Sequence, residues 1–302
     1  MTTNQGSAAN HSNERILSVL PSPSKGSHEA EVEAAKRFAF GKNWRNFINT
    51  VDDRRIKAAT DSLARLLGPD KVRGRSFLDI GSGSGLSSLA ALRLGASRVH
   101  SFDYDAESVA STTEMRLRTA PDAANWTIEQ GDALSETYLA SLGTFDIVYS
   151  WGVLHHTGQM WKALDSVTAL VAPGGTLSVA LYNDQGRASR VWVRLKRLYN
   201  LLPARLRPVM VVTYAIYGEL RSIVGRRRRG LVANPFRHWA MYREQRGMSV
   251  WHDYVDWMGG YPFEVATPAQ VRAFYEARGF SLAREFTVGR DLGCNEFVFT
   301  RR

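Results

Sequence analysis

The chain has 302 residues, of which 44% are hydrophobic, and it carries a formal net charge of +10. This length and composition are sufficient to bury the core of one enzyme-sized unit, and no second self-contained domain is visible. A single cysteine, Cys294, excludes an internal disulfide and a cysteine-based zinc cluster.

The first 28 residues are rich in Ser, Asn and Gly, and their one apolar run, residues 16–20, is too short for the core of a signal peptide. We therefore expect residues 1–28 to be a flexible tail on a cytoplasmic protein. Helical windows at 29–40 and 54–67 indicate an N-terminal helical section over residues 29–75. Within it, Phe40 and Trp44 either close over a bound ligand or only dock these helices on the sheet.

A short apolar strand runs into a glycine-rich turn at residues 77–85, and a helical window follows at once. Glycines let the backbone turn sharply and approach a ligand, and the helix behind offers unpaired N–H groups to an anion. The next strand-like segment ends in Asp103, 22 residues after Gly81, the distance at which a βαβ unit brings a carboxylate to a ribose diol. Leu86 stands where a dinucleotide fingerprint has its third glycine, which argues against a nicotinamide cofactor.

Strand-like runs alternate with helical windows along the rest of the chain, at residues 106–119, 134–142, 160–170 and 267–278. This alternation argues for an α/β fold. Thr267 and Pro268 supply an N-cap and a first-turn proline for the last of these helices.

Five segments occur in a characteristic order: D-I-G-S-G-S-G from Asp79, the acid Asp103, G-D-A from Gly131, F-D-I-V-Y-S-W-G-V-L-H-H from Phe145, and V-A-P-G-G-T-L from Val171. In this order they resemble class I S-adenosylmethionine-dependent methyltransferases, and within these the small-molecule branch to which ubiquinone-biosynthesis methyltransferases belong. The resemblance covers about residues 76–181 and the tail from residue 267. It implies a doubly wound, mostly parallel seven-stranded Rossmann-like sheet that ends in an antiparallel hairpin at 281–300.

The resemblance also implies S-adenosyl-L-methionine as the cofactor. The glycines would cradle its methionine part, with Asp79 near the ammonium group. Asp103 would accept hydrogen bonds from the ribose hydroxyls, and Ser150 would lie at the floor of the cofactor site, close to the methionine part. Asp132 and Ala133 would hold the adenine edge, although Asp132 also fits a helix N-cap before Leu134. The cofactor-binding residues predicted in this way are Asp79, Gly81, Ser82, Gly83, Gly85, Asp103, Tyr104, Asp132, Ala133 and Ser150.

We place the cofactor-binding α/β core at residues 76–182 and its completion, the last helix and hairpin, at 267–302. The segment between them, residues 183–266, is too long for a connecting loop. Helical windows at 189–202 and 209–224 predict a helical lid for the substrate. Residues 183–229 contain twelve Lys or Arg and two acidic residues, Asp184 and Glu219. The net charge of this segment, 12 − 2 = +10, equals the formal net charge of the whole chain.

The basic lid, with its run Arg226–Arg229, has three interpretations. It is a basic amphipathic surface that contacts an anionic membrane, a surface that attracts RNA or a phosphorylated substrate, or a solvated face without a partner. Residues 209–217 are too short an apolar run to span a bilayer. No appended RNA-binding module is recognisable, which argues against nucleic acid.

Chemistry is expected on the loop after the fourth strand and on the lid. His155 or His156 is predicted as the general base, because imidazole titrates near neutrality; a packing role is the alternative. The aromatic and acidic stretch 248–264 suits a small-molecule pocket and resembles a W-H-D-x-x-D-W-x-G-G-x-P-F-E signature of an uncharacterised bacterial branch. A metal at His252 and Asp253 is the weaker idea, because adjacent residues do not converge on one ion, and no metal site is predicted. The predicted substrate residues are Trp151, Tyr182, Trp251, His252 and Asp253.

The sequence therefore predicts a cytoplasmic methyltransferase acting on a small or medium-sized acceptor, with hydroxyl oxygen favoured. The alternatives are an N- or C-methyltransferase, an RNA-modifying methyltransferase that uses the basic lid, and a non-catalytic cofactor-binding partner protein.

Overall fold

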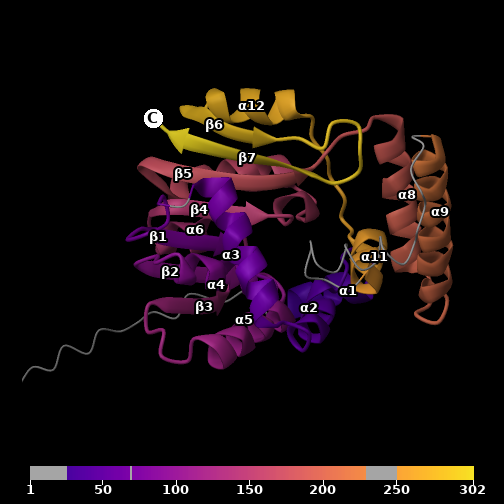
Figure 1. The fold of residues 1–302 in the computed structure, drawn as a ribbon, viewed down its shortest axis with the longest axis horizontal. Helices are drawn as coiled ribbons and strands as arrows, with labels where there is room; N and C mark the ends of the chain where they lie inside the picture. The colour runs from indigo at the N-terminus through magenta and orange to yellow at the C-terminus, as the bar shows by residue number, and fades with distance from the viewer. Residues whose placement is uncertain (1–25, 69, 229–249) are drawn as a thin grey trace, which may run out of the picture.

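The computed structural model describes residues 26–68, 70–228 and 250–302 of the chain. Seven strands form one sheet in the order β3-β2-β1-β4-β5-β7-β6 (Figure 1). All run parallel except β7, which pairs antiparallel with both β5 and β6. The strands are β1 (Ser76–Ile80), β2 (Arg98–Asp103), β3 (Trp126–Gln130), β4 (Phe145–Trp151), β5 (Val171–Tyr182), β6 (Phe280–Phe286) and β7 (Cys294–Arg301). The predicted α/β, mostly parallel seven-stranded sheet with a terminal antiparallel hairpin is confirmed.

Both faces of the sheet are buried, which explains why its central strands are almost continuously apolar. In β1, Phe77 packs in the core under one face and Leu78 in the core under the other, because successive side chains of a strand point to opposite sides. The face of Phe77 is covered by α3 (Asp53–Leu67), α4 (Leu86–Arg93) and α5 (Ala106–Thr119). The face of Leu78 is covered by α6 (Glu136–Leu142), α7 (Met160–Ser166) and α12 (Pro268–Glu276).

Three helical windows differ from the predicted ones and one cap is as predicted. The window at 29–40 is helical only as far as Glu33, and the next helix begins at Phe40. The window at 134–142 becomes helical only from Glu136, because Ser135 caps α6 by accepting from the N–H of Tyr138. The window at 160–170 divides into α7 and a 3-10 turn, η2 (Val167–Leu170). The cap of α12 is the predicted one, with Thr267 at the N-cap and proline in the first turn.

The N-terminal section contains α1 (Gly26–Glu33) and α2 (Phe40–Ile48) before α3. Helix α1 begins at Gly26, inside the segment predicted as a tail, while residues 1–25 lie outside the described residues. Helix α2 packs against α5, close to the carboxyl ends of the strands (Figure 1). This position brings the N-terminal section to the edge of the sheet where the glycine turn lies.

The segment between β5 and α12 contains α8 (Arg187–Leu201), α9 (Arg207–Arg228) and α11 (Val250–Gly259). Helices α8 and α9 stand at one end of the molecule, with α11 between them and the N-terminal section (Figure 1). An apolar cluster of Phe38, Tyr199, Val211 and Met258 joins these parts. None of the helices in the described ranges is long and apolar enough to cross a membrane. That this segment serves as a lid for the substrate stays a prediction.

Candidate active site

Strands β1 and β4 are neighbours at the centre of the sheet, and the chain moves outward from β1 to β3 on one side and from β4 to β5 on the other. The carboxyl ends of β1 and β4 are therefore the topological switch point, where open α/β sheets bind ligands. Asp103 is the last residue of β2, and the glycine turn, Asp132 and the loop of His155 come shortly after β1, β3 and β4, so all four lie at this edge.

The turn between β1 and α4 contains three glycines with positive φ, namely Gly81 (77°), Gly83 (55°) and Gly85 (77°). A Cβ at Gly81 would lie 2.4 Å from Cγ1 of Val153, and one at Gly85 would lie 2.9 Å from Cγ2 of Thr112. Both positions therefore require glycine for space as well as for conformation. The hydroxyl of Ser82 is hydrogen-bonded to that of Thr112 at 2.9 Å, which holds the turn against α5.

Asp103 ends β2 and directs its carboxylate at the glycine turn. Its Oδ2 accepts the N–H of Gly83 and its Oδ1 accepts the N–H of Asp105, each at 3.0 Å. Burial raises the pKa of Asp103 to about 7, although these two N–H groups oppose the shift. A carboxylate has roughly four lone-pair sites, so two remain for further donors such as a pair of hydroxyls.

Asp79 and Ser150 lie beneath the turn and are both buried. Asp79 accepts the hydroxyl of Ser88, which is itself 2.6 Å from the hydroxyl of Ser101. Burial raises the pKa of Asp79 to about 6, and the hydrogen bond from Ser88 opposes that shift. Ser150 donates its hydroxyl to the carbonyl of Ile80 at 3.1 Å. Both residues thus support the turn from below, and their contacts with the methionine part of a cofactor stay predictions.

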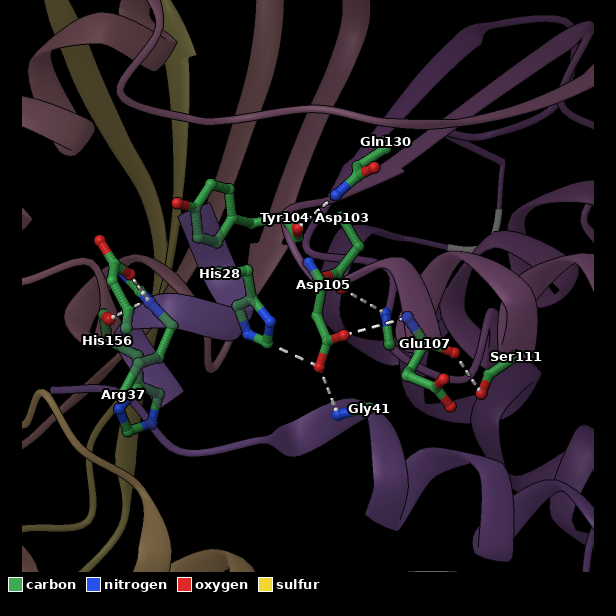
Figure 2. Close-up of polar contacts among 12 residues, drawn as sticks. His28, Arg37, Gly41, Asp103, Tyr104, Asp105, Glu107, Ser111, Gln130 and His156 are labelled. Atoms are coloured by element: carbon green, nitrogen blue, oxygen red, sulfur yellow. Dashed lines mark hydrogen bonds and ion pairs between the residues drawn. The ribbon is translucent and has the colours of Figure 1, made fainter. Parts of the chain in front are cut away.

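The segment after β3 lies beside the end of β2. Gln130 donates its Nε2 to the carbonyl of Tyr104 at 3.0 Å (Figure 2). Asp132 accepts the N–H of Leu134 at 2.8 Å, and Ala133 is buried. The N-cap alternative for Asp132 is wrong, because Ser135 caps α6 and Asp132 closes a turn before it. The adenine contacts of Asp132 and Ala133 stay predictions.

Asp105 joins the N-terminal section to this edge of the sheet (Figure 2). Its Oδ2 accepts the N–H of Gly41 at 2.8 Å and lies 3.7 Å from Nε2 of His28, while its Oδ1 caps α5. Trp44 of α2 then lies over the glycine turn, since its Nε1 would be 3.0 Å from a Cβ at Gly83. Docking of α2 and coverage of the turn are therefore achieved by the same contacts.

Arg37 connects the N-terminal section to the loop after β4. Its guanidinium donates to the carbonyl of His156 at 2.8 Å and lies 5.1 Å from the ring centre of Tyr104 (Figure 2). The ring of Phe40 is 4.9 Å from that of His156, measured between centroids. Arg37 thus links Tyr104 at the cofactor edge to the loop of His156, against which Phe40 packs.

His155 and His156 belong to the 3-10 turn η1 (Leu154–His156) and are both buried, with ring centroids 4.4 Å apart. Nδ1 of His156 donates to the carbonyl of Pro262 at 2.5 Å, which leaves Nε2 as the acceptor of a neutral ring. In the part of the chain that the structure describes, neither ring nitrogen of His155 meets full hydrogen-bond geometry, although the carbonyl of Ala180 lies near enough to raise its pKa.

Burial makes both imidazoles weak bases. It lowers the pKa of His156 to about 3, and it lowers the pKa of His155 well below its ordinary value of 6.5. The carbonyl of Ala180 opposes the shift of His155 only in part, and the positive charge of Lys196 adds to it. Both rings are therefore neutral at pH 7, the form that can accept a proton.

Lys196 of α8 is fully buried within an aromatic cage beside the two histidines. Its Nζ lies 4.3 Å from the ring centre of Trp257, 4.7 Å from that of Phe263 and 5.7 Å from that of Tyr182. The ring of Tyr182 is in turn 4.0 Å from that of His155. Burial lowers the pKa of Lys196 to about 7, opposed by the negative charge of nearby acidic groups.

The same lysine also closes the end of α11. Its Nζ donates to the carbonyl of Trp257, and Asn200 one turn later donates to the carbonyl of Gly259 at 2.8 Å. Both carbonyls belong to the last turn of α11 and have no partner within the helix. Lys196 and Asn200 therefore fix the position of α11 on α8.

Two of the other predicted substrate residues, Trp151 and Trp251, do not lie at this point. Trp151 is exposed and donates Nε1 to Glu296 of β7 at 2.7 Å. Trp251 is exposed on α11. His252 and Asp253 belong to the same helix, but their side chains lie outside the described residues. Of the predicted substrate residues whose side chains the structure describes, Tyr182 is the one that lies beside the histidines.

Sequence reasoning missed Arg37, Asp105 and Lys196. Asp105 has a local signal, because it directly precedes a helix and is of a residue type that caps helices. Arg37 and Lys196 have none, since each meets its backbone partner across 119 and 61 residues of chain, respectively.

The residues at the switch point fit S-adenosylmethionine. Asp103 keeps lone pairs free for the ribose hydroxyls, and the glycine turn presents backbone without side chains. Gly85 is the N-cap of α4 and provides no side-chain cap, so N–H groups of the first turn remain available to a carboxylate such as that of the methionine part.

A seven-stranded sheet of this order, with a glycine turn after β1 and an acid after β2 at its switch point, defines the class of S-adenosylmethionine-dependent methyltransferases. Residues 78–177 match the family model described as a methyltransferase domain. The chain therefore contains a methyltransferase domain of this class.

The same region is similar to curated methyltransferases. The chain is 32% identical over 122 residues to a ribosomal protein L11 methyltransferase of Xanthomonas campestris, which covers 39% of this chain and 35% of that protein. It is 30% identical over 123 residues to a ubiquinone biosynthesis O-methyltransferase of a Methylobacterium species, which covers 40% and 47%. The chain thus spans less than half the length of these relatives.

Among solved structures, magnesium protoporphyrin IX methyltransferase from Synechocystis PCC 6803, with bound SAH, has a TM-score of 0.51 at 16% identity. The match covers 86% of this chain and 94% of that one. At this level of identity the likeness shows the fold.

Proposed function

We propose that this protein is an S-adenosylmethionine-dependent methyltransferase that methylates a hydroxyl oxygen of a small or medium-sized acceptor. One observation carries the cofactor part of the proposal. The carboxylate of Asp103, held by the N–H of Gly83, lies beside a turn of three positive-φ glycines at the switch point. The relatives named above act on a ribosomal protein and in ubiquinone biosynthesis, so the acceptor is argued from this chain alone.

When bound, S-adenosylmethionine supplies a methyl group on a sulfonium, which is already a good leaving group. The protein then has to align the acceptor, exclude water and remove its proton. Trp44 and the contacts of Asp105 with Gly41 support water exclusion, because they hold the N-terminal section over the glycine turn.

His155 is the residue best suited to take the proton. Its ring nitrogens have no described partner in hydrogen-bond geometry, whereas Nδ1 of His156 is occupied by the carbonyl of Pro262. A neutral imidazole accepts the hydroxyl proton as the new oxygen–methyl bond forms. A neutral amine is a good nucleophile without losing its proton first, whereas a hydroxyl becomes one as its proton is removed, so a buried neutral base favours a hydroxyl acceptor over an amine.

The lid supports a small acceptor with an apolar or aromatic body. The ring of Tyr182 lies against His155, and Trp257 and Phe263 extend this aromatic surface, since the three rings lie 5.0–6.1 Å from one another. Small-molecule sites are typically lined in this way, with few polar groups. Because His155 is fully buried, the reacting hydroxyl has to enter the protein rather than lie on its surface.

Incubation with cofactor carrying a deuterated methyl group, in the presence of cell extract, tests the proposal. RNA, lipid and small-molecule pools are then separated and analysed by mass spectrometry. We expect the heavy methyl group on oxygen in a small-molecule or lipid pool with the wild-type protein, and a strong reduction with His155→Gln. Label confined to RNA would contradict the proposed acceptor, and label in no pool would contradict the proposed activity.

A further inference from the structure

Exposed apolar side chains are concentrated on the hairpin formed by α8 and α9. Of the sixteen large hydrophobic side chains that are exposed in the described residues, ten lie between residues 191 and 224. Single exposed hydrophobic residues are ordinary on a protein surface, but a contiguous group marks an interaction site.

On α9 these side chains form one stripe. Its members follow at intervals of three or four residues, which places them on one face of a helix: Val209, Val212, Ile216, Leu220 and Val224. Each is between 45% and 63% exposed. The stripe runs for roughly 22 Å at the helical rise of about 1.5 Å per residue. The opposite side of α9 packs inward, with Val211 buried and the ring of Tyr214 5.2 Å from that of Trp192 on α8.

Arginines are exposed on the adjacent helix α8. Arg190, Arg194 and Arg197 are exposed on α8, where Val191, Leu198 and Leu201 lie between and beside them. None of these three arginines forms an ion pair within the described ranges. Glu219 is the one acidic residue in the sequence from residue 187 to 228, and four further arginines occupy positions 226–229. The side chains of Arg226–Arg229 lie outside the described residues.

We propose that this surface, the exposed apolar and arginine side chains of α8 and α9, binds an anionic lipid membrane. A bilayer interface offers both of the chemistries that the surface requires, since apolar side chains enter the acyl boundary while arginines meet anionic headgroups. RNA would meet the arginines but leave the apolar stripe in water. A second copy of the hairpin would cover the stripe but bring arginines together with almost no acidic residues to oppose them.

The hairpin is well placed for such contact. Helix α9 is the outermost element at its end of the molecule, away from the sheet (Figure 1). Helix α8 has two functional sides, because Lys196 and Tyr199 face the buried aromatic cage while Arg194 and Arg197 face outward. Helix α8 thus connects the proposed membrane-binding surface to the candidate acceptor site.

Sedimentation of the full chain with vesicles tests the inference. We expect binding to vesicles of phosphatidylcholine and phosphatidylglycerol in equal parts, and little binding to phosphatidylcholine alone. The triple variant Arg190→Gln, Arg194→Gln, Arg197→Gln should bind on the order of 100-fold more weakly, since each basic residue contributes about fivefold near an anionic surface. The double variant Ile216→Gln, Leu220→Gln should lose about tenfold or more, because apolar burial is removed without a change in charge.

Control variants carry substitutions of the same types at exposed positions elsewhere. Leu117 is 63% exposed on α5, and Arg73 and Arg93 are exposed in the sheet region. Leu117→Gln and the double variant Arg73→Gln, Arg93→Gln should bind vesicles as the wild type does, and all variants should melt within a few degrees of it. Controls that lose binding equally would overturn the proposal. So would binding to RNA without binding to anionic vesicles, or a dimer that the Ile216→Gln, Leu220→Gln variant dissociates.

Discussion

Replacement of Asp103 with Asn tests the ribose contact with the smallest change of shape. The carboxylate accepts the N–H groups of Gly83 and Asp105, whereas an amide accepts only one of them and turns its own NH2 toward the other. The variant also loses the charge that would strengthen hydrogen bonds from the ribose hydroxyls. Hydrogen bonds to charged groups contribute about 1.5–3 kcal/mol, so the affinity for S-adenosylhomocysteine should fall roughly 10- to 150-fold.

The same variant should abolish a pH dependence. Burial raises the pKa of Asp103 from its ordinary value of 3.8 to about 7, so the folded state holds this proton more tightly than the unfolded state. The contribution of Asp103 to the free energy of unfolding is therefore highest at low pH and is lost as pH rises toward 7. Over the same range Asp103 becomes ionised, which is the form that accepts hydrogen bonds from the ribose hydroxyls. Wild-type affinity should weaken up to about tenfold per pH unit below 7, and the Asn variant should show no such trend.

Isothermal titration with S-adenosylhomocysteine at pH 6 and pH 8 measures both effects. Asp122, which is exposed in the turn before β3, provides the matched control Asp122→Asn. The reasoning is refuted if a folded Asp103→Asn protein binds within about twofold of wild type at pH 8, well short of a charged hydrogen bond. It is also refuted if the pH trend persists in that variant.

Three further substitutions address the turn, the base and the lid. Gly81→Ala should lower the melting temperature far more than Gly74→Ala. Both glycines have a positive φ, which strains an alanine, but only at Gly81 would the new Cβ also collide with a neighbouring side chain. Equal losses in the two variants would contradict this packing argument. His155→Gln should lower turnover by about 10²–10⁴-fold while its affinity for the cofactor stays near wild type. His156→Gln should lower the melting temperature as well as turnover. If both variants keep turnover within about threefold of wild type, neither histidine is the base. In the wild type, burial lowers the pKa of Lys196 to about 7 in the folded state, below its value in the unfolded state. Between pH 7 and pH 10 the unfolded state therefore binds one more proton, and the free energy of unfolding should rise with pH. Lys196→Met should remove this rise. Denaturant unfolding of wild type and variant at several pH values measures it, and an unchanged slope with pH would contradict the burial of this charge.

The cofactor side of the molecule could be predicted from sequence because its signals are local. Gly81, Gly83 and Gly85 follow directly after an apolar strand, and Asp103 ends the next one. In a parallel sheet the residues after each strand gather at one edge, so sequence order alone places them together. The same logic placed His155 and His156 beside that edge.

The acceptor side could not be predicted in the same way, because it depends on contacts between distant segments. Lys196 reads as one more basic residue of an amphipathic helix, and only the packing of α8 against α11 buries it in an aromatic cage. Trp151 was predicted from its place at the end of the fourth strand and Trp251 from an aromatic stretch, but both side chains are exposed to solvent. The N-cap of α6 is Ser135 and not the predicted Asp132. Both residue types cap helices, so a segment that contains both offers two alternative starting points for one helix.

The central claim is that the switch point binds S-adenosylmethionine, and a calorimetric comparison of S-adenosylhomocysteine with NAD tests it most directly. Both ligands offer a ribose diol to Asp103, but only the first has a methionine-derived carboxylate and ammonium for the glycine turn and the N-terminus of α4. We predict saturable binding of one S-adenosylhomocysteine per chain and much weaker binding of NAD. Tighter binding of NAD, or no binding of S-adenosylhomocysteine by the folded protein, would contradict the account.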